Sequence, residues 1–302
     1  MSVRFSRLVL AGLAALIVIG VWVPPAPPPN PKTVAGGDIV LFRAVVDRMR
    51  AGETYYATMR DELRQRGYPT ASIFNWRPPA TVVLMARAPA AVHLIMLVLG
   101  VIAVAGTTRL FREQPAYAKV IAIFFVTGSA VLPLIPIDGL YLPELWAGIA
   151  LLLSVVAYSL GAVRLGVGCA VAAVFARELA MPYLLACLAF AVRDRRTKEV
   201  RWYAIGLVLF SAYYIGHIVV ARGFIHPGDM SHTYSWISFG GWPFVVSLAA
   251  LGGWHILLPR WTGAIGAVLV ASSLWSPADR QVADGFRKQE EQPCLRHLRY
   301  AE

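Results

Sequence analysis

The sequence predicts an all-α polytopic membrane protein. Of its 302 residues, 58% are hydrophobic and only 15% are charged. The mean hydropathy is +0.60. The apolar residues are gathered in runs that approach the ~20 residues a helix needs to cross ~30 Å of hydrocarbon. A water-soluble domain could not bury so much apolar surface, so the composition excludes that class.

Charge and cysteine content exclude two further classes. The net charge is +11, but the Lys and Arg residues are spread over loops between apolar runs. We therefore interpret them as topology signals and contacts for anionic membrane lipids, and predict no nucleic-acid partner. The three cysteines show neither metal-ligand spacing nor a disulfide pattern. The sequence predicts no cofactor and no bound metal.

The N-terminal part predicts an anchor and an outer loop. Arg4 and Arg7 precede an apolar run over 8–23, which fits a signal peptide or an uncleaved anchor. A proline-rich stretch follows and no small-residue cleavage site does, which favours the anchor. Both interpretations place the loop 24–80 outside the cytoplasm. Helical spacing over 38–51 and 54–66 predicts two amphipathic helices on the membrane surface.

Further spans follow in a single transmembrane domain that covers 1–276. We expect them at 81–107, with Pro89 separating a surface helix from the crossing, and at 118–137, 143–163, 202–221 and 239–258. Basic residues in the loops after 81–107 and 143–163 mark the cytoplasmic side. The run 262–276 is short for a span, and the sequence leaves open on which side the polar tail 277–302 lies.

The segment 165–192 favours a hairpin over a single span. One crossing would carry the basic cluster 193–201 to the outer side, whereas half-helices over 165–176 and 179–192 return it to the cytoplasm. The hairpin places Arg177 and Glu178 at a turn near the outer face. As helical neighbours their side chains diverge, so each should need another partner. A charge at this depth costs ~2.5–3.5 kcal/mol, which favours a functional role, with a structural ion pair to another span as the alternative.

Several motifs of the outer loop resemble a known superfamily. They are Asp38, Phe42, Arg43, Ala44, Asp47, Gly52, Tyr55, Tyr68 and the stretch 75–79, Asn-Trp-Arg-Pro-Pro. This series resembles the first outer loop of GT-C integral-membrane glycosyltransferases, and is most similar to the polyprenyl-phosphomannose-dependent mannosyltransferases of phosphatidylinositol mannoside assembly and their bacterial relatives. The short helices around Arg177 resemble the paired helices of the same superfamily. Arg77 departs from the pattern, where relatives often carry an aromatic residue, and the shorter chain suggests a minimal or truncated member.

The resemblance implies a GT-C-like helical bundle in the inner (plasma) membrane. Its site would face the extracytoplasmic side and transfer a sugar from a polyprenyl-phosphate donor to a hydroxyl of a lipid or glycan acceptor. Asp38 would act as general base, and because phosphate is a good leaving group no protein acid is needed. Cations would hold the departing phosphate. Spacing alone fits a helix-capping role for Asp38 equally well.

The candidate substrate-binding residues come from three parts of the chain: Arg77, Arg177, Glu178, Arg222, His226 and His232. The arginines would bind phosphate and Glu178 a sugar hydroxyl or a second basic group, while the loop with His226 and His232 would close over the substrate. A metal site through these histidines and Asp229 is a minor alternative, since His-Pro-Gly-Asp is also an ordinary turn. Tyr141 and Glu144 are weaker candidates, and His217 is expected to make a helix-packing hydrogen bond.

Two other functions remain open. A transporter or flippase of lipid-linked sugars would show repeated halves with broken helices in both, and the sequence shows one broken pair without a repeat. A noncatalytic membrane scaffold would use the outer helices to bind a partner.

Overall fold

The computed structural model describes residues 37–231, and all regular structure in this range is helical, without a strand. The all-α prediction is confirmed for this part of the chain. The predicted anchor at 8–23, the span at 239–258, the run at 262–276 and the tail at 277–302 lie outside the described residues.

The two predicted loop helices are α2, Gly37–Arg50, and α3, Tyr55–Gln65. A short 3-10 helix, η1, Ile73–Asn75, leads to α4, Ala80–Arg87. The apolar face of α2 packs on α3 and α4, and Trp76, only 1% exposed, lies in the same core. These helices therefore form a compact layer around the stretch that carries Arg77.

The next two long helices are α5, Pro89–Leu110, and α6, Ala116–Ala130. The predicted break at Pro89 is confirmed, because a proline at the first helical position starts a new helix and cannot continue the previous one. Helix α6 ends earlier than predicted, since Pro133 and Pro136 remove backbone donors. Two 3-10 helices take its place, η2, Leu132–Leu134, and η3, Ile137–Tyr141.

The second half of the described chain contains the predicted hairpin. Helix α7, Pro143–Ser159, is followed by α8, Val163–Ala176, the 3-10 helix η4, Glu178–Ala180, α9, Met181–Arg193, and α10, Thr197–Arg222. The Tyr158 hydroxyl contacts Glu199 and Tyr203, so the end of α7 and the start of α10 lie together. Helix α9 therefore returns to the level at which α8 began, as predicted.

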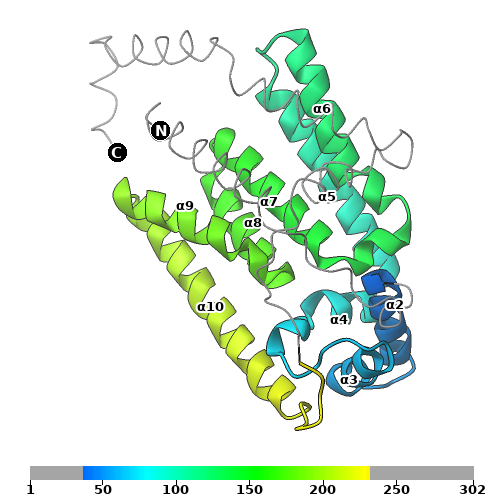
Figure 1. The fold of residues 1–302 in the computed structure, drawn as a ribbon. Helices are drawn as coiled ribbons and strands as arrows, with labels where there is room; N and C mark the ends of the chain where they lie inside the picture. Colours follow the sequence, from blue (N-terminus) through cyan, green and yellow to red (C-terminus); the bar gives the residue numbers. More distant parts are fainter. Residues whose placement is uncertain (1–36, 232–302) are drawn as a thin grey trace, which may run out of the picture.

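The molecule has two distinct ends. One, which we call the loop end, holds α2, α3, α4, the break at Arg177 and the segment 223–231; Figure 1 shows α2, α3 and α4 near the end of α10 at the bottom of the view. The other, the turn end, holds the connections 111–115, 160–162 and 194–196. Val156 would contact a Cβ at Gly106, which places the ends of α5 and α7 together there.

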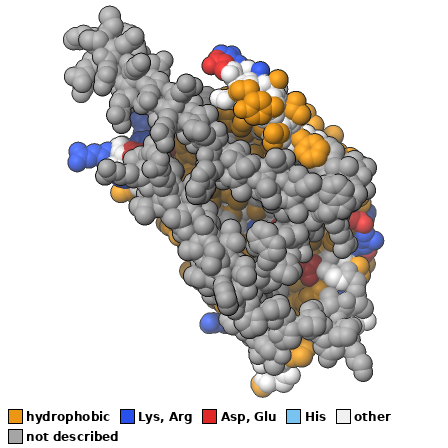
Figure 2. Space-filling view, turned by 45° about the horizontal axis from the view of Figure 1, so that its top comes forward, with side chains coloured by type: hydrophobic (Ala, Val, Ile, Leu, Met, Phe, Trp, Pro, Cys, Tyr) orange, Lys and Arg blue, Asp and Glu red, His pale blue; other side chains and the backbone are white. Residues whose placement is uncertain are grey.

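Within residues 37–231, three helical segments are long and apolar enough to cross a membrane: Pro89–Leu110, Ala116–Leu134 and Thr197–Arg222. Their outward faces expose large apolar side chains, among them Leu94, Tyr117 and Val208 at 63–70% exposure. Figure 2 shows hydrophobic side chains gathered on the visible face where it is not grey. Contiguous exposed apolar surface of this kind marks a membrane or protein contact.

Candidate functional site

Two arginines and two glutamates meet at the loop end of the molecule. Arg177 Nε lies 3.0 Å from Glu144 Oε1, and Arg177 Nη1 donates to Glu178 Oε1 at 2.7 Å. Arg77 Nη2 lies 3.8 Å from Glu144 Oε1, and Arg77 Nη1 lies 3.8 Å from Glu178 Oε1. We call these four residues the arginine–glutamate cluster. It joins the stretch before α4, the start of α7 and the break between α8 and α9.

Three of the four side chains of the cluster are largely buried, Glu144 is about half exposed, and the cluster is incompletely hydrogen-bonded. The Arg177 side chain is 7% exposed and that of Glu178 is 20% exposed. Within residues 37–231, Arg177 Nε and Glu178 Oε2 are buried without a hydrogen-bond partner. Arg177 Nε forms an ion pair with Glu144, but its N–H does not point at the carboxylate oxygen. Buried polar atoms are rarely left unpaired in folded proteins. The cluster therefore has a free donor and a free acceptor for a further polar group.

Arg177 and Glu178 pair with each other, which corrects the expectation that their side chains diverge. Arg177 is the C-cap of α8 with φ −152° and ψ 118°, so it is extended and not helical. In this conformation its guanidinium reaches both the next residue and Glu144 on α7. The structure thus combines the expected second partner with an unexpected neighbour pair.

Hydrogen bonds from α3 and α10 hold the backbone next to Arg77. The Tyr55 hydroxyl donates to the Arg77 carbonyl. His217 Nε2 contacts the Trp76 carbonyl at 2.8 Å and its Nδ1 lies 3.0 Å from the Tyr56 hydroxyl. These contacts fit a tautomer in which Nε2 donates and Nδ1 accepts. The prediction of a packing hydrogen bond for His217 is confirmed, and its effect is to position the stretch that carries Arg77.

Asp38 lies in the first turn of α2 and bonds to an aromatic residue of the same loop. Its Oδ1 accepts a hydrogen bond from the Tyr68 hydroxyl at 2.9 Å. Burial, together with this carboxylate, raises the pKa of Tyr68 above its ordinary value, so the phenol stays protonated and remains the donor. Asp38 also interacts electrostatically with Arg177. No hydrogen bond or ion pair within residues 37–231 joins Asp38 directly to the arginine–glutamate cluster.

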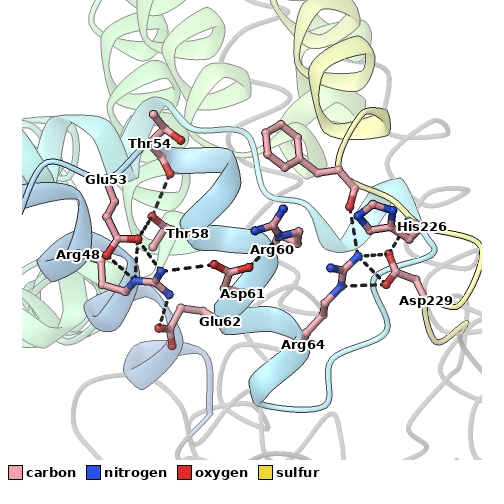
Figure 3. A network of polar contacts seen from close by, with 11 residues as sticks. Arg48, Glu53, Thr54, Thr58, Arg60, Asp61, Glu62, Arg64, His226 and Asp229 are labelled. Atoms are coloured by element: carbon pink, nitrogen blue, oxygen red, sulfur yellow. Dashed lines mark hydrogen bonds and ion pairs between the residues drawn. The ribbon is translucent and has the colours of Figure 1, made fainter.

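The loop after α10 makes different contacts. Arg222 is exposed at the end of α10, and His226 is exposed, with its backbone N–H donating to Asp229 Oδ2 at 2.9 Å. Arg64 of α3 donates two hydrogen bonds to the Asp229 carboxylate, at 2.9 and 3.0 Å, as Figure 3 shows. No contact joins Arg222 or His226 to the arginine–glutamate cluster within the described range, and His232 lies outside it.

The Asp229 carboxylate is occupied by Arg64, which disfavours the alternative of a metal site with His226. Arg64 and the backbone of His226 lower the pKa of Asp229 below its ordinary value of 3.8. Residues 37–231 contain no group of three His, Cys, Asp or Glu side chains arranged to hold a metal ion. The loop is thus fixed to α3 at a carboxylate that was a candidate ligand.

A second charged network, also drawn in Figure 3, joins α2 and α3. Arg48 contacts Glu53, Asp61 and Glu62 at 2.5–3.4 Å. The Arg48 side chain is about one-third exposed, and exposed ion pairs contribute little each. We assign this network to the packing of the two loop helices.

Glu144, a weaker candidate in the sequence analysis, is a member of the cluster. It follows Pro143 in the first turn of α7. An acidic residue is favoured there by the helix dipole, so its presence does not by itself indicate a site. It also lines a pocket of about 350 Å3 between α6 and α7 whose other walls are mostly apolar: Phe125, Val126, Ser129, Ala130, Leu145, Gly148, Ile149 and Leu152. The pocket links an apolar surface to the charged cluster through one carboxylate.

Comparison with protein-family models, with curated proteins and with solved structures finds no match to this chain. The fold and the geometry of the cluster are therefore the basis on which a function is proposed.

Proposed function

We propose that the protein is a multi-pass membrane glycosyltransferase of GT-C type. It moves a sugar from a polyprenyl-phosphate donor to a hydroxyl of a lipid or glycan at the extracytoplasmic face. The observation that carries the proposal is the pair Arg77 and Arg177, which share Glu144 and Glu178. Arg177 is buried and has a donor that makes no hydrogen bond.

The charge distribution supports this orientation in the membrane. The turn end carries nine basic and three acidic residues: Arg109, Arg112, Lys119, Arg164, Arg193, Arg195, Arg196, Lys198 and Arg201 with Glu113, Asp194 and Glu199. The described residues of the loop end carry ten basic and nine acidic residues. The two ends carry similar numbers of basic residues, but those of the turn end lie in or beside three short connections, where Lys and Arg bias a loop most strongly toward the cytoplasm. The turn end therefore faces the cytoplasm and the cluster faces the outer side.

The cluster has the chemistry of a phosphate site. Guanidinium groups bind phosphate through paired N–H donors and remain charged at any physiological pH. Glu144 is 49% exposed, so its carboxylate can leave the arginines when a phosphate takes its place. The free Nε of Arg177 then finds an acceptor. Two buried cations also stabilise the negative charge that develops on the departing phosphate.

The pocket between α6 and α7 is suited to the donor's hydrocarbon chain. Its apolar walls come from two helices, one of which is exposed to the surroundings, and Glu144 connects it to the arginines. A chain lying there would place the phosphate of the same molecule at the cluster. A lipid-linked donor explains why apolar and cationic groups adjoin at this point.

Asp38 is assigned the proton transfer. Tyr68 occupies one carboxylate oxygen, and the other can accept the proton of the acceptor hydroxyl. The acceptor oxygen then bonds to the anomeric carbon, the bond from that carbon to the phosphate oxygen breaks, and polyprenyl phosphate leaves as an anion. A positioned base of this kind contributes about 10²–10⁴-fold to the rate.

The test uses the full chain in proteoliposomes with a panel of labelled polyprenyl-phosphate sugars. We expect Asp38→Asn to lower sugar transfer about 10²–10⁴-fold. Asp47→Asn, which removes an exposed carboxylate from the same helix, should retain activity. Undiminished transfer by Asp38→Asn would remove this residue as the base, and absence of transfer by the wild-type protein with every donor would argue against the enzyme.

A further inference from the structure

In the described part of the chain, four helices end in the same hydrogen-bonded cap. In each, the N–H two residues beyond the cap position donates five residues back: Glu53 to Arg48 after α2, Tyr68 to Leu63 after α3, Ala162 to Ala157 after α7 and Arg196 to Ala191 after α9. This Schellman arrangement requires a left-handed residue just before the donor. Its φ is 100° at Gly52, 71° at Gly67, 78° at Gly161 and 57° at Arg195.

Arg195 is the exception among these four caps. Glycine is the usual residue here because it lacks the Cβ that clashes in the left-handed region. Arg195 is also the one non-glycine residue with positive φ in the described range. The backbone of an arginine at this position is strained, and the arginine does not improve the turn relative to glycine. The presence of a charged side chain here therefore requires another explanation.

Three cations stand together at this turn without an acidic partner. Arg195, Lys198 and Arg201 are exposed, and no ion pair joins them to another residue within 37–231. The acidic residues nearby are already engaged, since Asp194 pairs with Arg193 and Glu199 with Arg196. Like charges three residues apart repel, and an anion between them removes that repulsion.

Hydrogen bonds around Glu199 hold the backbone that carries these cations. Glu199 is buried and accepts hydrogen bonds from Arg196 at 2.6 Å and from Tyr158 at 3.3 Å. Tyr158 also contacts the Tyr203 hydroxyl at 2.6 Å, which ties the start of α10 to α7. Trp202, adjacent to Arg201, is 53% exposed. Exposed tryptophan next to basic residues at the end of an apolar helix is typical of the headgroup zone.

We propose that the turn between α9 and α10 is a binding site for the phosphate of an anionic phospholipid in the leaflet at the turn end. Arg195, Lys198 and Arg201 supply the charge, and Trp202 lies among the headgroups. The inference does not depend on the proposed transferase activity, because it concerns the opposite end of the molecule.

The test measures thermal unfolding and native mass spectra of the full chain in mild detergent. Phosphatidylglycerol, phosphatidylcholine and inorganic phosphate are the three probes. We expect phosphatidylglycerol to raise the unfolding temperature and to remain bound, with a smaller effect of the other two. Removing each cation should weaken the phosphatidylglycerol effect about fivefold. The triple variant R195Q/K198Q/R201Q should therefore lose it.

Two substitutions of Arg195 separate binding from local structure. Arg195→Gly relieves the left-handed strain, so it should unfold at a higher temperature without lipid while its response to phosphatidylglycerol falls. Arg195→Lys keeps both the strain and the charge and should keep the response. If Arg195→Gly unfolds at a lower temperature without lipid and responds normally, the side chain serves the end of α9 and the proposal is overturned.

A matched control removes three cations from another turn at the same end. R109Q/R112Q/K119Q alters the α5–α6 connection and should leave the phosphatidylglycerol response intact. Equal loss in this control would show a general charge effect and overturn the site. An equal effect of inorganic phosphate would overturn the assignment to a lipid.

Discussion

Arg177 shows how one backbone conformation creates the candidate site. Its extended φ and ψ end α8 and allow the next residues to start η4. A helical residue at this position would point its side chain away from that of its neighbour. Because Arg177 is extended, its guanidinium contacts Glu178 and Glu144 together and is 93% hidden from solvent by the surrounding helices, with 7% of the side chain exposed.

The structural and functional parts of Arg177 can be separated by substitution. Arg177→Met leaves two carboxylates facing one guanidinium, so we expect a loss of about 3 kcal/mol in the free energy of unfolding. Adding Glu178→Gln removes the uncompensated charge and should restore most of that stability. Binding of labelled polyprenyl phosphate should stay weak in both variants. A double variant that regains binding would show that the cluster holds the fold and not the donor.

At the scale of elements, glycine decides how closely α5 and α6 approach. A Cβ at Gly100 would lie 2.5 Å from the Ala130 carbonyl oxygen, a backbone atom that cannot turn away. Small residues at helix contacts let backbones pack closely in membranes. The close approach also positions the end of α6, which lines the pocket beside Glu144.

Gly100→Ala is therefore expected to destabilise the protein by about 1–3 kcal/mol through overpacking. Gly168→Ala in α8 is the matched control, because no described atom lies within 4 Å of its Cβ position. The control should be neutral or stabilising by up to about 1 kcal/mol through helix propensity. Thermal unfolding of the two variants in the same detergent measures the difference. Equal stability would contradict the packing assigned to α5 and α6.

The loop 223–231 contacts α3 through the carboxylate of Asp229 and through Phe224. Asp229 accepts from Arg64 and from the His226 backbone, and Met230 accepts from the Ala71 N–H at 3.1 Å. This element was expected to cover the substrate. Its contacts join the end of α10 to α3 and to the stretch after α3.

Arg64 lowers the pKa of Asp229 below its ordinary value of 3.8. The contact therefore stabilises the loop at pH values above 3.8, and this stabilisation is lost as the pH falls through the lowered pKa. We expect amide exchange in 223–231, measured by mass spectrometry, to accelerate over that acidic range beyond the intrinsic change. Asp229→Asn should exchange faster at neutral pH, by the equivalent of about 1–3 kcal/mol, and show little further pH dependence. A variant with wild-type protection at neutral pH would contradict the role of this contact.

At the scale of the whole molecule, charge is divided between two ends that the fold assembles from distant segments. The basic connections 111–115, 160–162 and 194–196 share one end although they are separated along the chain. The balanced charges of α2, α3 and the segment 223–231 share the other. The concentration of Lys and Arg in or beside the short connections of the turn end supports the proposed membrane orientation.

Cysteine labelling tests that orientation directly. The three native cysteines, Cys169, Cys187 and Cys294, are first replaced by alanine. We expect Lys198→Cys to react with a membrane-impermeant maleimide only from the cytoplasmic side and Met230→Cys only from the outer side. Intact cells expose the outer side of the protein to the reagent, and inverted vesicles expose the cytoplasmic side. Labelling of both positions from one side would break the assignment of the cluster to the extracytoplasmic face.

Local sequence patterns were sufficient for the helices, the break at Pro89 and the hairpin at Arg177. These features depend on apolar runs, prolines and loop charge, which act over a few residues. The early end of α6 was missed because the apolar run continues past the prolines that terminate the helix. The membership of Arg77, Arg177 and Glu178 in one cluster agrees with the candidates chosen from the sequence.

Only the tertiary structure determined the pairing of these groups. Glu144 lies 33 residues before Arg177 and Arg64 lies 165 residues before Asp229, and no local pattern relates such positions. The packing of α7 on α8 brings the first pair together, and the position of α10's end on α3 brings the second. Periodicity reports which face of a helix is buried, whereas the partner of a charged side chain depends on which helices become neighbours when the chain folds.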